Sequence, residues 1–214
     1  TYVLKALVDS LTGTLMTADA AAWFASFSAQ PYSVVPYHII VVVGTLLTLF
    51  LGAHSIEKTN KIMMPLFFLI FLVLAVRVFF LPGAAEGYQF MFTPRWEALA
   101  DPMIWIWAMG QAGFSLSVTG SGMIVYGAYL SPQEDVVGVA QHTALFDTIA
   151  AVVAALVIIP ACFSYGLDVG AGPSLLFVTL PTILQDIPLG QLFAVILYIA
   201  MIFAGVSSLQ NMFE

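Results

Sequence analysis

Charged residues are scarce in this chain of 214 residues: they make up 8% of it, whereas soluble domains carry about 25%. Hydrophobic residues make up 61%, and the mean hydropathy is +1.02. These proportions exclude a water-soluble globular domain. They also exclude a disordered chain, which needs much charge and few apolar residues. Basic residues are the scarcest, with 5 Lys and Arg against 12 Asp and Glu, and the net charge of −7 excludes binding to nucleic-acid phosphates.

Cysteine is almost absent, since Cys162 is the single one in the sequence. The sequence therefore excludes an intrachain disulfide bond and a metal site built from cysteines. Cys162 lies in an apolar run, where we expect it to be a small buried hydrophobic residue. These absences leave an integral membrane protein with several spans.

Apolar runs long enough to cross a bilayer recur along the chain, since a spanning helix needs about 20 such residues. The predicted spans cover residues 37–54, 62–81, 102–130, 136–165 and 191–214, and residues 1–15 are typical of the last part of a further helix. The apolar segment 171–189 is too short to span, and we expect two short helices there that lie across an outer cavity as a lid or plug. We expect residues 1–214 to be one transmembrane domain from the middle of a longer transporter.

Orientation is predicted from lysine and arginine in the loops, which favour the cytoplasmic side. Lys58 and Lys61 place the predicted loop 54–61 in the cytoplasm. The loops 82–101 and 166–190 then lie outside, and the turn 131–136 lies inside.

The predicted span 102–130 is interrupted by small and polar residues. Its middle reads MGQAGFSLSVTGSGM over residues 109–123. Each glycine costs a continuous helix about 1 kcal/mol relative to alanine. One interpretation is a helix that is broken near the membrane midplane and lines a binding site, because irregular backbone is tolerated in a bilayer only inside protein or along a cavity. The other is a face of small residues for close helix packing.

Asp147 lies deep in the apolar run HTALFDTIAAVV. A carboxylate there costs about 2.5–3.5 kcal/mol on insertion scales and by default indicates a function. A bound sodium ion or a proton would offset that cost, and a protonated aspartate bonded to a neighbouring helix is the structural alternative. Ser207 and Ser208, in the run AGVSSLQN, are likewise either oxygen ligands for sodium or hydroxyls that hold two helices together.

Several segments together resemble one family of transporters. The segments TPRWEALADPMIWIWAMGQAGFSLS, VYGAYLS, ALFDT, AGPSLLFVTLP and FAGVSS occur in the order in which they occur in the neurotransmitter:sodium symporter family, and the chain resembles its bacterial members. The resemblance implies an all-α, LeuT-like fold that is partial, running from late in the third transmembrane helix to the eighth. It also implies a discontinuous helix around residues 113–122.

The resemblance implies roles for particular residues. Residues matching the substrate site are Phe114, Ser115, Ser117, Gly120, Ser208 and Met212. Residues matching the first sodium site are Ser115 and Asp147, and those matching the second are Ala204, Ser207 and Ser208.

Three positions depart from the family pattern or vary within it. Gly120 replaces a phenylalanine of the family, which removes one wall of the pocket for the substrate side chain. Ser55 replaces a glycine that lets the cytoplasmic end of the fifth helix unwind. Chloride-dependent relatives have an asparagine at the position of Asp147 and a serine at that of Ala151, so we expect no chloride requirement here.

The expected function is sodium-coupled symport of a neutral, bulky amino acid by alternating access, with Na⁺ as the co-transported ion and no enzymatic activity. Expected partners are the amino acid and membrane lipid, with no nucleic acid, and a homo-oligomer is left open. The expected location is the cell membrane of a prokaryote, as a multi-pass protein. Two alternatives stand beside this: a proton-driven amino-acid carrier that uses Asp147, and a non-transporting membrane sensor or scaffold with the same fold.

Overall fold

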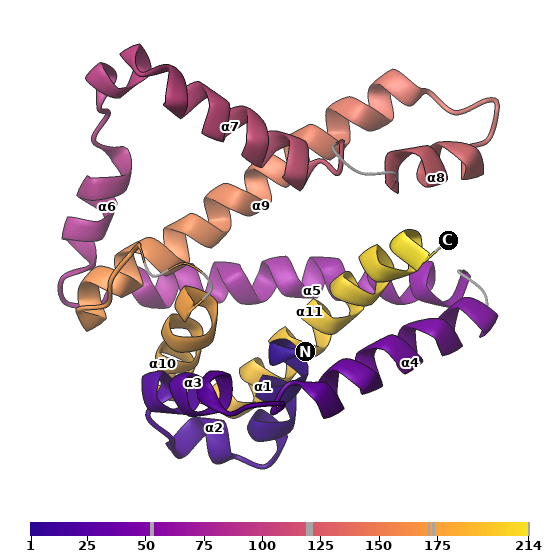
Figure 1. Ribbon diagram of the computed structural model, residues 1–214. Helices are drawn as coiled ribbons and strands as arrows, with labels where there is room; N and C mark the ends of the chain where they lie inside the picture. The colour runs from indigo at the N-terminus through magenta and orange to yellow at the C-terminus, as the bar shows by residue number, and fades with distance from the viewer. Residues whose placement is uncertain (52–53, 119–121, 171, 173, 214) are drawn as a thin grey trace.

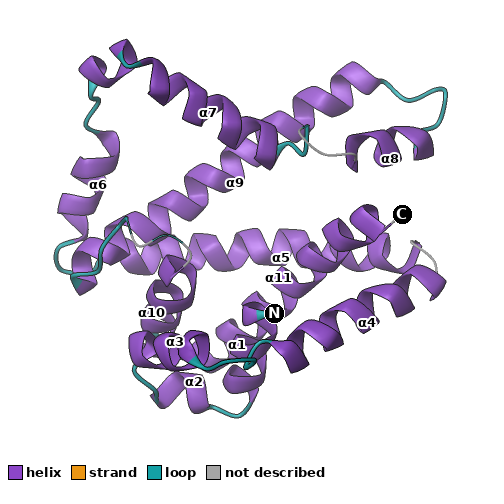
Figure 2. Cartoon of the chain, viewed as in Figure 1, coloured by secondary structure: helices purple, strands orange, loops and turns teal. Residues whose placement is uncertain are grey.

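The computed structural model describes residues 1–51, 54–118, 122–170, 172 and 174–213 (Figure 1). None of the described residues forms a β-strand, and short turns and loops connect the helices (Figure 2). The α-helices are α1 (Tyr2–Leu11), α2 (Thr14–Thr17), α3 (Ala20–Ala29), α4 (Val35–Leu51), α5 (His54–Phe79), α6 (Ala84–Phe92), α7 (Pro102–Ser115), α8 (Gly122–Tyr129), α9 (Val136–Tyr165), α10 (Leu180–Gln185) and α11 (Gly190–Phe213). A 3₁₀-helix, η1, covers Trp96–Ala100, and a π-helical turn, η2, covers Leu175–Thr179.

The buried core lies where α5, α9, α10 and α11 meet α1. Its fully buried side chains include Leu74 of α5, Val157 of α9, Ile183 of α10 and Leu197 of α11. Lipid is as apolar as these residues, so close packing rather than transfer out of water holds the helices together. The other half of the fold is more open: α7, α8 and the first half of α9 extend away from this core (Figure 1).

The first thirty residues form more than the single helix end predicted for residues 1–15. Helix α1 ends at Leu11, and Gly13 then adopts a φ of +78°, which glycine accepts without strain. Helices α2 and α3 follow. The indole N–H of Trp23 on α3 donates to the buried carboxylate of Asp9 on α1 at 2.6 Å, and Lys5 pairs with the same carboxylate. These contacts fasten α3, which the sequence analysis missed, to α1.

The two segments predicted as loops on either side of the span 62–81 are helical in whole or in part, so the prediction of irregular loops there is wrong. Residues 54–61 belong to α5, and the glutamate and lysines in this segment are good helix formers. Residues 82–101 contain α6 and η1. Pro82 cannot continue α5, and Gly83 has a φ of +85°, so the chain turns by 113° between α5 and α6.

The segment predicted as two short lid helices is one continuous helical stretch. The π-helical turn Leu175–Thr179 runs directly into α10, and Pro181 lies at the start of α10. Pro181 lacks the N–H that an uninterrupted α-helix would need at this point, which explains the irregular turn before it. Most of the stretch is buried against the core, and the side-chain amide of Gln185 donates to the Leu15 and Ala18 carbonyls at 2.6 and 2.9 Å.

Within the described residues, two helices are long and apolar enough to cross a membrane individually: α9, and α11 as far as Gln210. The bent pair α5–α6 would make a third. Helix α4 has 17 residues and spans about 25 Å, slightly less than the roughly 30 Å hydrocarbon core. Helices α7 and α8 are shorter still, because the span predicted over residues 102–130 is interrupted.

Helix α6 packs tightly on α9 at Gly87, and we expect Gly87→Ala to destabilise the protein. A Cβ atom there would lie 2.4 Å from the Cα of Pro160, a backbone atom that cannot move unless α9 moves. Overpacking of this kind costs about 1–3 kcal/mol, which should lower the melting temperature of the purified protein in detergent. Gly110→Ala is the control, because an added Cβ there meets no atom within 4 Å. Equal melting temperatures for the two variants would contradict this packing.

Candidate functional site

The break in the span 102–130 is confirmed. Helix α7 begins with Asp101 as its N-cap, whose carboxylate accepts from the Met103 amide at 2.9 Å, and with Pro102 in the first turn. It ends at Ser115, residues 116–118 form a turn, and the next described helix, α8, begins at Gly122. Thr119, Gly120 and Ser121 lie outside the described residues, so the predicted role of Gly120 stays a prediction.

The end of α7 is closed by its own backbone. Ser117 has a φ of +56°, its amide donates to the Phe114 carbonyl at 3.0 Å, and the Val118 amide donates to the Gly113 carbonyl at 2.9 Å. This pair of bonds is a Schellman motif, which usually has glycine at the left-handed position. Serine there costs roughly 1–2 kcal/mol, and strain of this kind concentrates at functional sites.

The two residues predicted for the first sodium site lie in direct contact. Ser115 is the last residue of α7, and its hydroxyl donates to the two carboxylate oxygens of Asp147 at 2.7 and 2.9 Å. Asp147 is half-buried in the middle of the unbroken helix α9. The contact therefore joins the broken helix to a continuous one, and it gathers a carboxylate and a hydroxyl, the oxygen donors that suit a hard cation.

The residues predicted for the second sodium site lie on α11. The Ser208 hydroxyl donates to the Ala204 carbonyl at 3.2 Å, so these two oxygens lie side by side. The side chain of Ser207 lies outside the described part of the chain. Helix α8 packs against α11, so the second half of the broken span lies beside the helix that carries this group.

The remaining described residues predicted for the substrate site are exposed. Phe114 is 76% exposed next to Ser115, and Met212 is 77% exposed one turn beyond Ser208. Ser117 is exposed as well. The structure thus brings together Ser115 with Asp147 and Ala204 with Ser208. Phe114 and Met212 are placed beside these groups along the chain.

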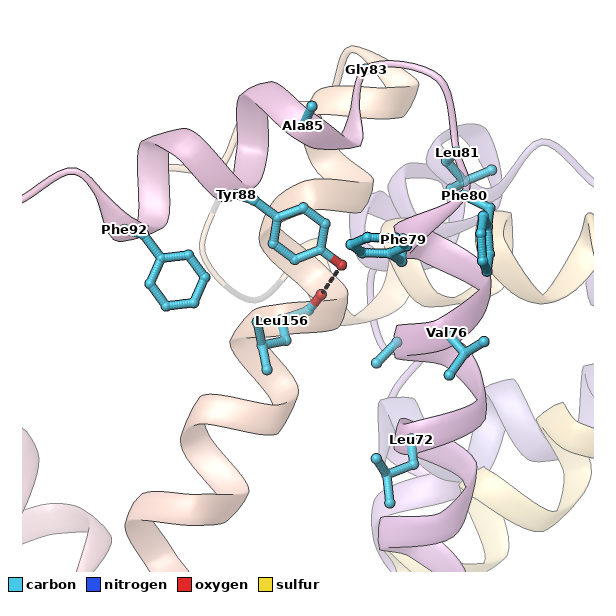
Figure 3. Close-up of a pocket in the computed structure, with 11 residues that line it drawn as sticks. Leu72, Val76, Phe79, Phe80, Leu81, Gly83, Ala85, Tyr88, Phe92 and Leu156 are labelled. Carbon is cyan, nitrogen blue, oxygen red and sulfur yellow. Dashed lines mark hydrogen bonds between the residues drawn. The ribbon is translucent and has the colours of Figure 1, made fainter.

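An apolar pocket of about 900 Å³ lies away from these residues, between α5, α6 and α9 (Figure 3). Leu72, Val76 and Phe79 line it from α5, and Tyr88 points into it from α6, its hydroxyl donating to the Leu156 carbonyl at 3.3 Å. None of the described residues predicted for the site lines this pocket. It has no group suited to a sodium ion beyond the one bonded hydroxyl, so we do not assign the transport site to it.

Polar contacts of α11 were missed in the sequence analysis. The Gln210 side chain is 7% exposed and donates to the Thr48 hydroxyl of α4 at 2.8 Å. At the other end of the helix, Gln191 donates to the Ser10 carbonyl of α1 at 2.9 Å. A glutamine in an apolar run was the available signal, because an amide inside a membrane needs a partner. The partners are 162 and 181 residues away in sequence, so only the fold identifies them.

Comparison with known proteins agrees with the family resemblance of the sequence. Residues 29–214 match the model of the sodium:neurotransmitter symporter family. The chain is 34% identical over its whole length to YhdH, an uncharacterized sodium-dependent transporter of Bacillus subtilis (strain 168), and covers 47% of that protein. It is 29% identical to an uncharacterized sodium-dependent transporter of Haemophilus influenzae, matching with all of its length and covering 48% of that protein.

A solved structure is similar over almost the whole chain. The crystal structure of MhsT in complex with L-phenylalanine matches with a TM-score of 0.92 and 34% sequence identity. The match covers 98% of this chain and 48% of MhsT. The chain therefore spans about half the length of the relatives that it matches.

Proposed function

Because the chain belongs to the sodium:neurotransmitter symporter family, whose members matched here are transporters and not enzymes, we propose that the full protein is a sodium-coupled amino-acid symporter. The family is one of membrane proteins with a LeuT-like fold. We place this member in the cell membrane of a prokaryote, surrounded by lipid, and leave its oligomeric state open.

The contact between Ser115 and Asp147 is the observation that carries the proposal. Asp147 supplies a negative charge beside the end of a broken helix, where a sodium ion would neutralise it. In this proposal the Ser115 hydroxyl turns from donating to the carboxylate to ligating the ion. Both groups then hold the ion next to Phe114 and Ser117, which contact the substrate.

A second sodium ion is proposed on α11, at the Ala204 carbonyl and the Ser207 and Ser208 hydroxyls. The Ser208 hydroxyl and the Ala204 carbonyl oxygen are neighbours, which supports this assignment. The two ions and the substrate bind in one occluded state, so each raises the affinity for the others, as linkage requires. Alternating access of this state to the two sides of the membrane then couples amino-acid uptake to the sodium gradient.

We propose that the substrate is a neutral, bulky amino acid. Gly120 stands where the family has an aromatic wall, which leaves room for a larger side chain, and Met212 is a flexible residue that adapts to irregular shapes. The similar structure of MhsT contains L-phenylalanine, an amino acid of this class.

Uptake by the full-length protein in proteoliposomes tests this function. We expect uptake of labelled leucine, methionine, phenylalanine or tryptophan that needs an inward sodium gradient and stops when potassium replaces sodium. In a competition panel, these amino acids should displace the label better than glycine or alanine. Better displacement by glycine or alanine would contradict the bulky substrate.

The same assay separates the two alternatives. Uptake that persists without sodium and collapses when the proton gradient is removed would indicate a proton-driven carrier. Amino-acid binding without uptake under either gradient would indicate a sensor or scaffold. Each of these results would overturn sodium-coupled symport.

A further inference from the structure

Gln210 makes a polar contact between two membrane helices. Its side chain is 7% exposed, and its amide nitrogen donates to the Thr48 hydroxyl of α4 at 2.8 Å. That hydroxyl in turn donates to the Thr45 carbonyl at 2.6 Å. Two consecutive hydrogen bonds therefore connect Gln210 of α11 through the Thr48 hydroxyl to the backbone of α4.

The surroundings of this contact are apolar. A cavity of about 240 Å³ between α4 and α11 is lined by Ile40 and Val41 on one side and by Phe203 and Val206 on the other. Close packing of Leu197 and Tyr198 in the core already restrains the rotation of α11 toward its N-terminal half. The Gln210–Thr48 bond adds a directional restraint near the other end of the helix.

The rotation decides where the proposed second sodium site points. Successive residues of an α-helix are about 100° apart, so Ser208 lies about 160° and Ala204 about 120° around the helix from Gln210. When Gln210 is bonded to α4, Ser208 and Ala204 therefore lie on the part of α11 turned away from α4, where the Ser208 hydroxyl donates to the Ala204 carbonyl. A second glutamine, Gln191, anchors the other end of α11 by donating to the Ser10 carbonyl at 2.9 Å.

We propose that Gln210, acting through Thr48, is a positioning residue that orients the sodium ligands of α11. This rests on the proposed function, because it requires a sodium ion at Ala204, Ser207 and Ser208. Gln210 does not contact the ion. It restrains the helix rotation that holds the Ser208 hydroxyl and the Ala204 carbonyl at the ion, so losing it weakens sodium binding and leaves the substrate contacts of α7 in place.

Sodium titration of uptake by the full-length protein tests the proposal. The variants are Gln210→Met, which keeps the length but loses the amide, and Thr48→Val, which loses only the hydroxyl. Each should raise the sodium concentration for half-maximal uptake by about threefold to tenfold, the range of interhelical hydrogen bonds in membranes. The double variant should need no more sodium for half-maximal uptake than the more strongly affected single variant, because both substitutions remove the same bond. Substrate affinity at saturating sodium should be unchanged.

Three further variants complete the test. Thr48→Ser keeps the hydroxyl and should retain the wild-type sodium dependence. Thr45→Val is the matched control, because the Thr45 hydroxyl donates to the Val41 carbonyl within α4 and not to Gln210. Ser208→Ala removes a proposed ligand and should shift the sodium titration at least as far as Gln210→Met. Size-exclusion chromatography checks that each variant folds. If Gln210→Met does not fold, the comparison of Thr48→Val with Thr48→Ser tests the proposal.

Several results would overturn the proposal. These are an unchanged sodium titration in Thr48→Val, additive shifts in the double variant, or a fall in maximal uptake without a shift. Failure of the proposed function is seen separately, because wild-type uptake would then be independent of sodium. Sodium-dependent wild-type uptake together with a Thr48→Val titration like that of Thr45→Val would overturn only the positioning role.

Discussion

Asp147→Ala is expected to abolish sodium-dependent uptake by the full-length protein while leaving it folded. The carboxylate is half-buried and accepts from the Ser115 hydroxyl at 2.7 and 2.9 Å. Helix α9 has no other acidic residue in its sequence that could replace this charge. A carboxylate and a sodium ion about 4 Å apart attract by about 4 kcal/mol at an effective dielectric constant of 20, and a partly exposed site retains less than this upper guide. That corresponds to a loss of roughly a hundredfold in sodium affinity.

The measurement is uptake against sodium concentration, with sodium binding followed by isothermal titration on the same preparation. Thr148→Val is the matched control on the next residue, since the Thr148 hydroxyl donates to the Ala144 carbonyl within α9. It should transport as the wild type does. Asp147→Ala with wild-type sodium dependence would remove Asp147 from the ion site and favour the structural interpretation of this residue.

Asp147→Asn separates a sodium ligand from a proton carrier. An asparagine oxygen still ligates sodium, so sodium-driven uptake should survive with a lower sodium affinity. An asparagine cannot take up and release a proton in this range, so a carrier driven by protons through Asp147 would lose its uptake altogether. A complete loss in Asp147→Asn, with the protein folded, would therefore support the proton-driven alternative.

Local sequence signals predicted the helix ends that depend on neighbouring residues. The glycines and hydroxyl residues of segment 109–123 indicated a broken helix, and α7 does end at Ser115. The apolar run 136–165 coincides with α9, whose N-cap Asp135 and C-terminal Gly166, with a φ of +65°, are ordinary helix signals. The pairing of Ser115 with Asp147, 32 residues apart, came from the family resemblance and not from any spacing in the sequence.

Hydropathy did not predict the helical segments that are too short or too polar to be recognised as membrane spans. Helices α3 and α6 are 10 and 9 residues long, too short to register as spans, and they were overlooked for that reason. Segment 54–61 is polar enough to suggest a loop, yet it continues α5. The contacts of Gln191 and Gln210 depend on which helices become neighbours, so their role required the fold.

Chloride-independent transport is the second large effect that we expect, and it follows from the same carboxylate. Two unit charges about 4 Å apart attract by about 4 kcal/mol at an effective dielectric constant of 20, which is an upper guide and not a net energy. Asp147 thus already supplies the negative charge that a chloride ion would bring to the first sodium site. A chloride ion nearby would be repelled by a similar amount.

The helix geometry also shows how chloride dependence could be introduced. Ala151 lies one turn after Asp147 on the unbroken helix α9, so both occupy one face, and the alanine has no group that donates to an anion. We expect Asp147→Asn combined with Ala151→Ser to make uptake depend partly on chloride, because the charge is removed and a hydroxyl donor is added. Ala151→Ser alone should stay chloride-independent and is the control.

Replacement of external and internal chloride by gluconate in the uptake assay measures both effects. Wild-type uptake and Ala151→Ser uptake should be unchanged, and uptake by the double variant should fall when chloride is withdrawn and recover when it is returned. A large loss of wild-type uptake in gluconate would show that Asp147 does not take the place of the anion. An active double variant that ignores chloride would show instead that the anion site needs groups beyond these two positions on α9.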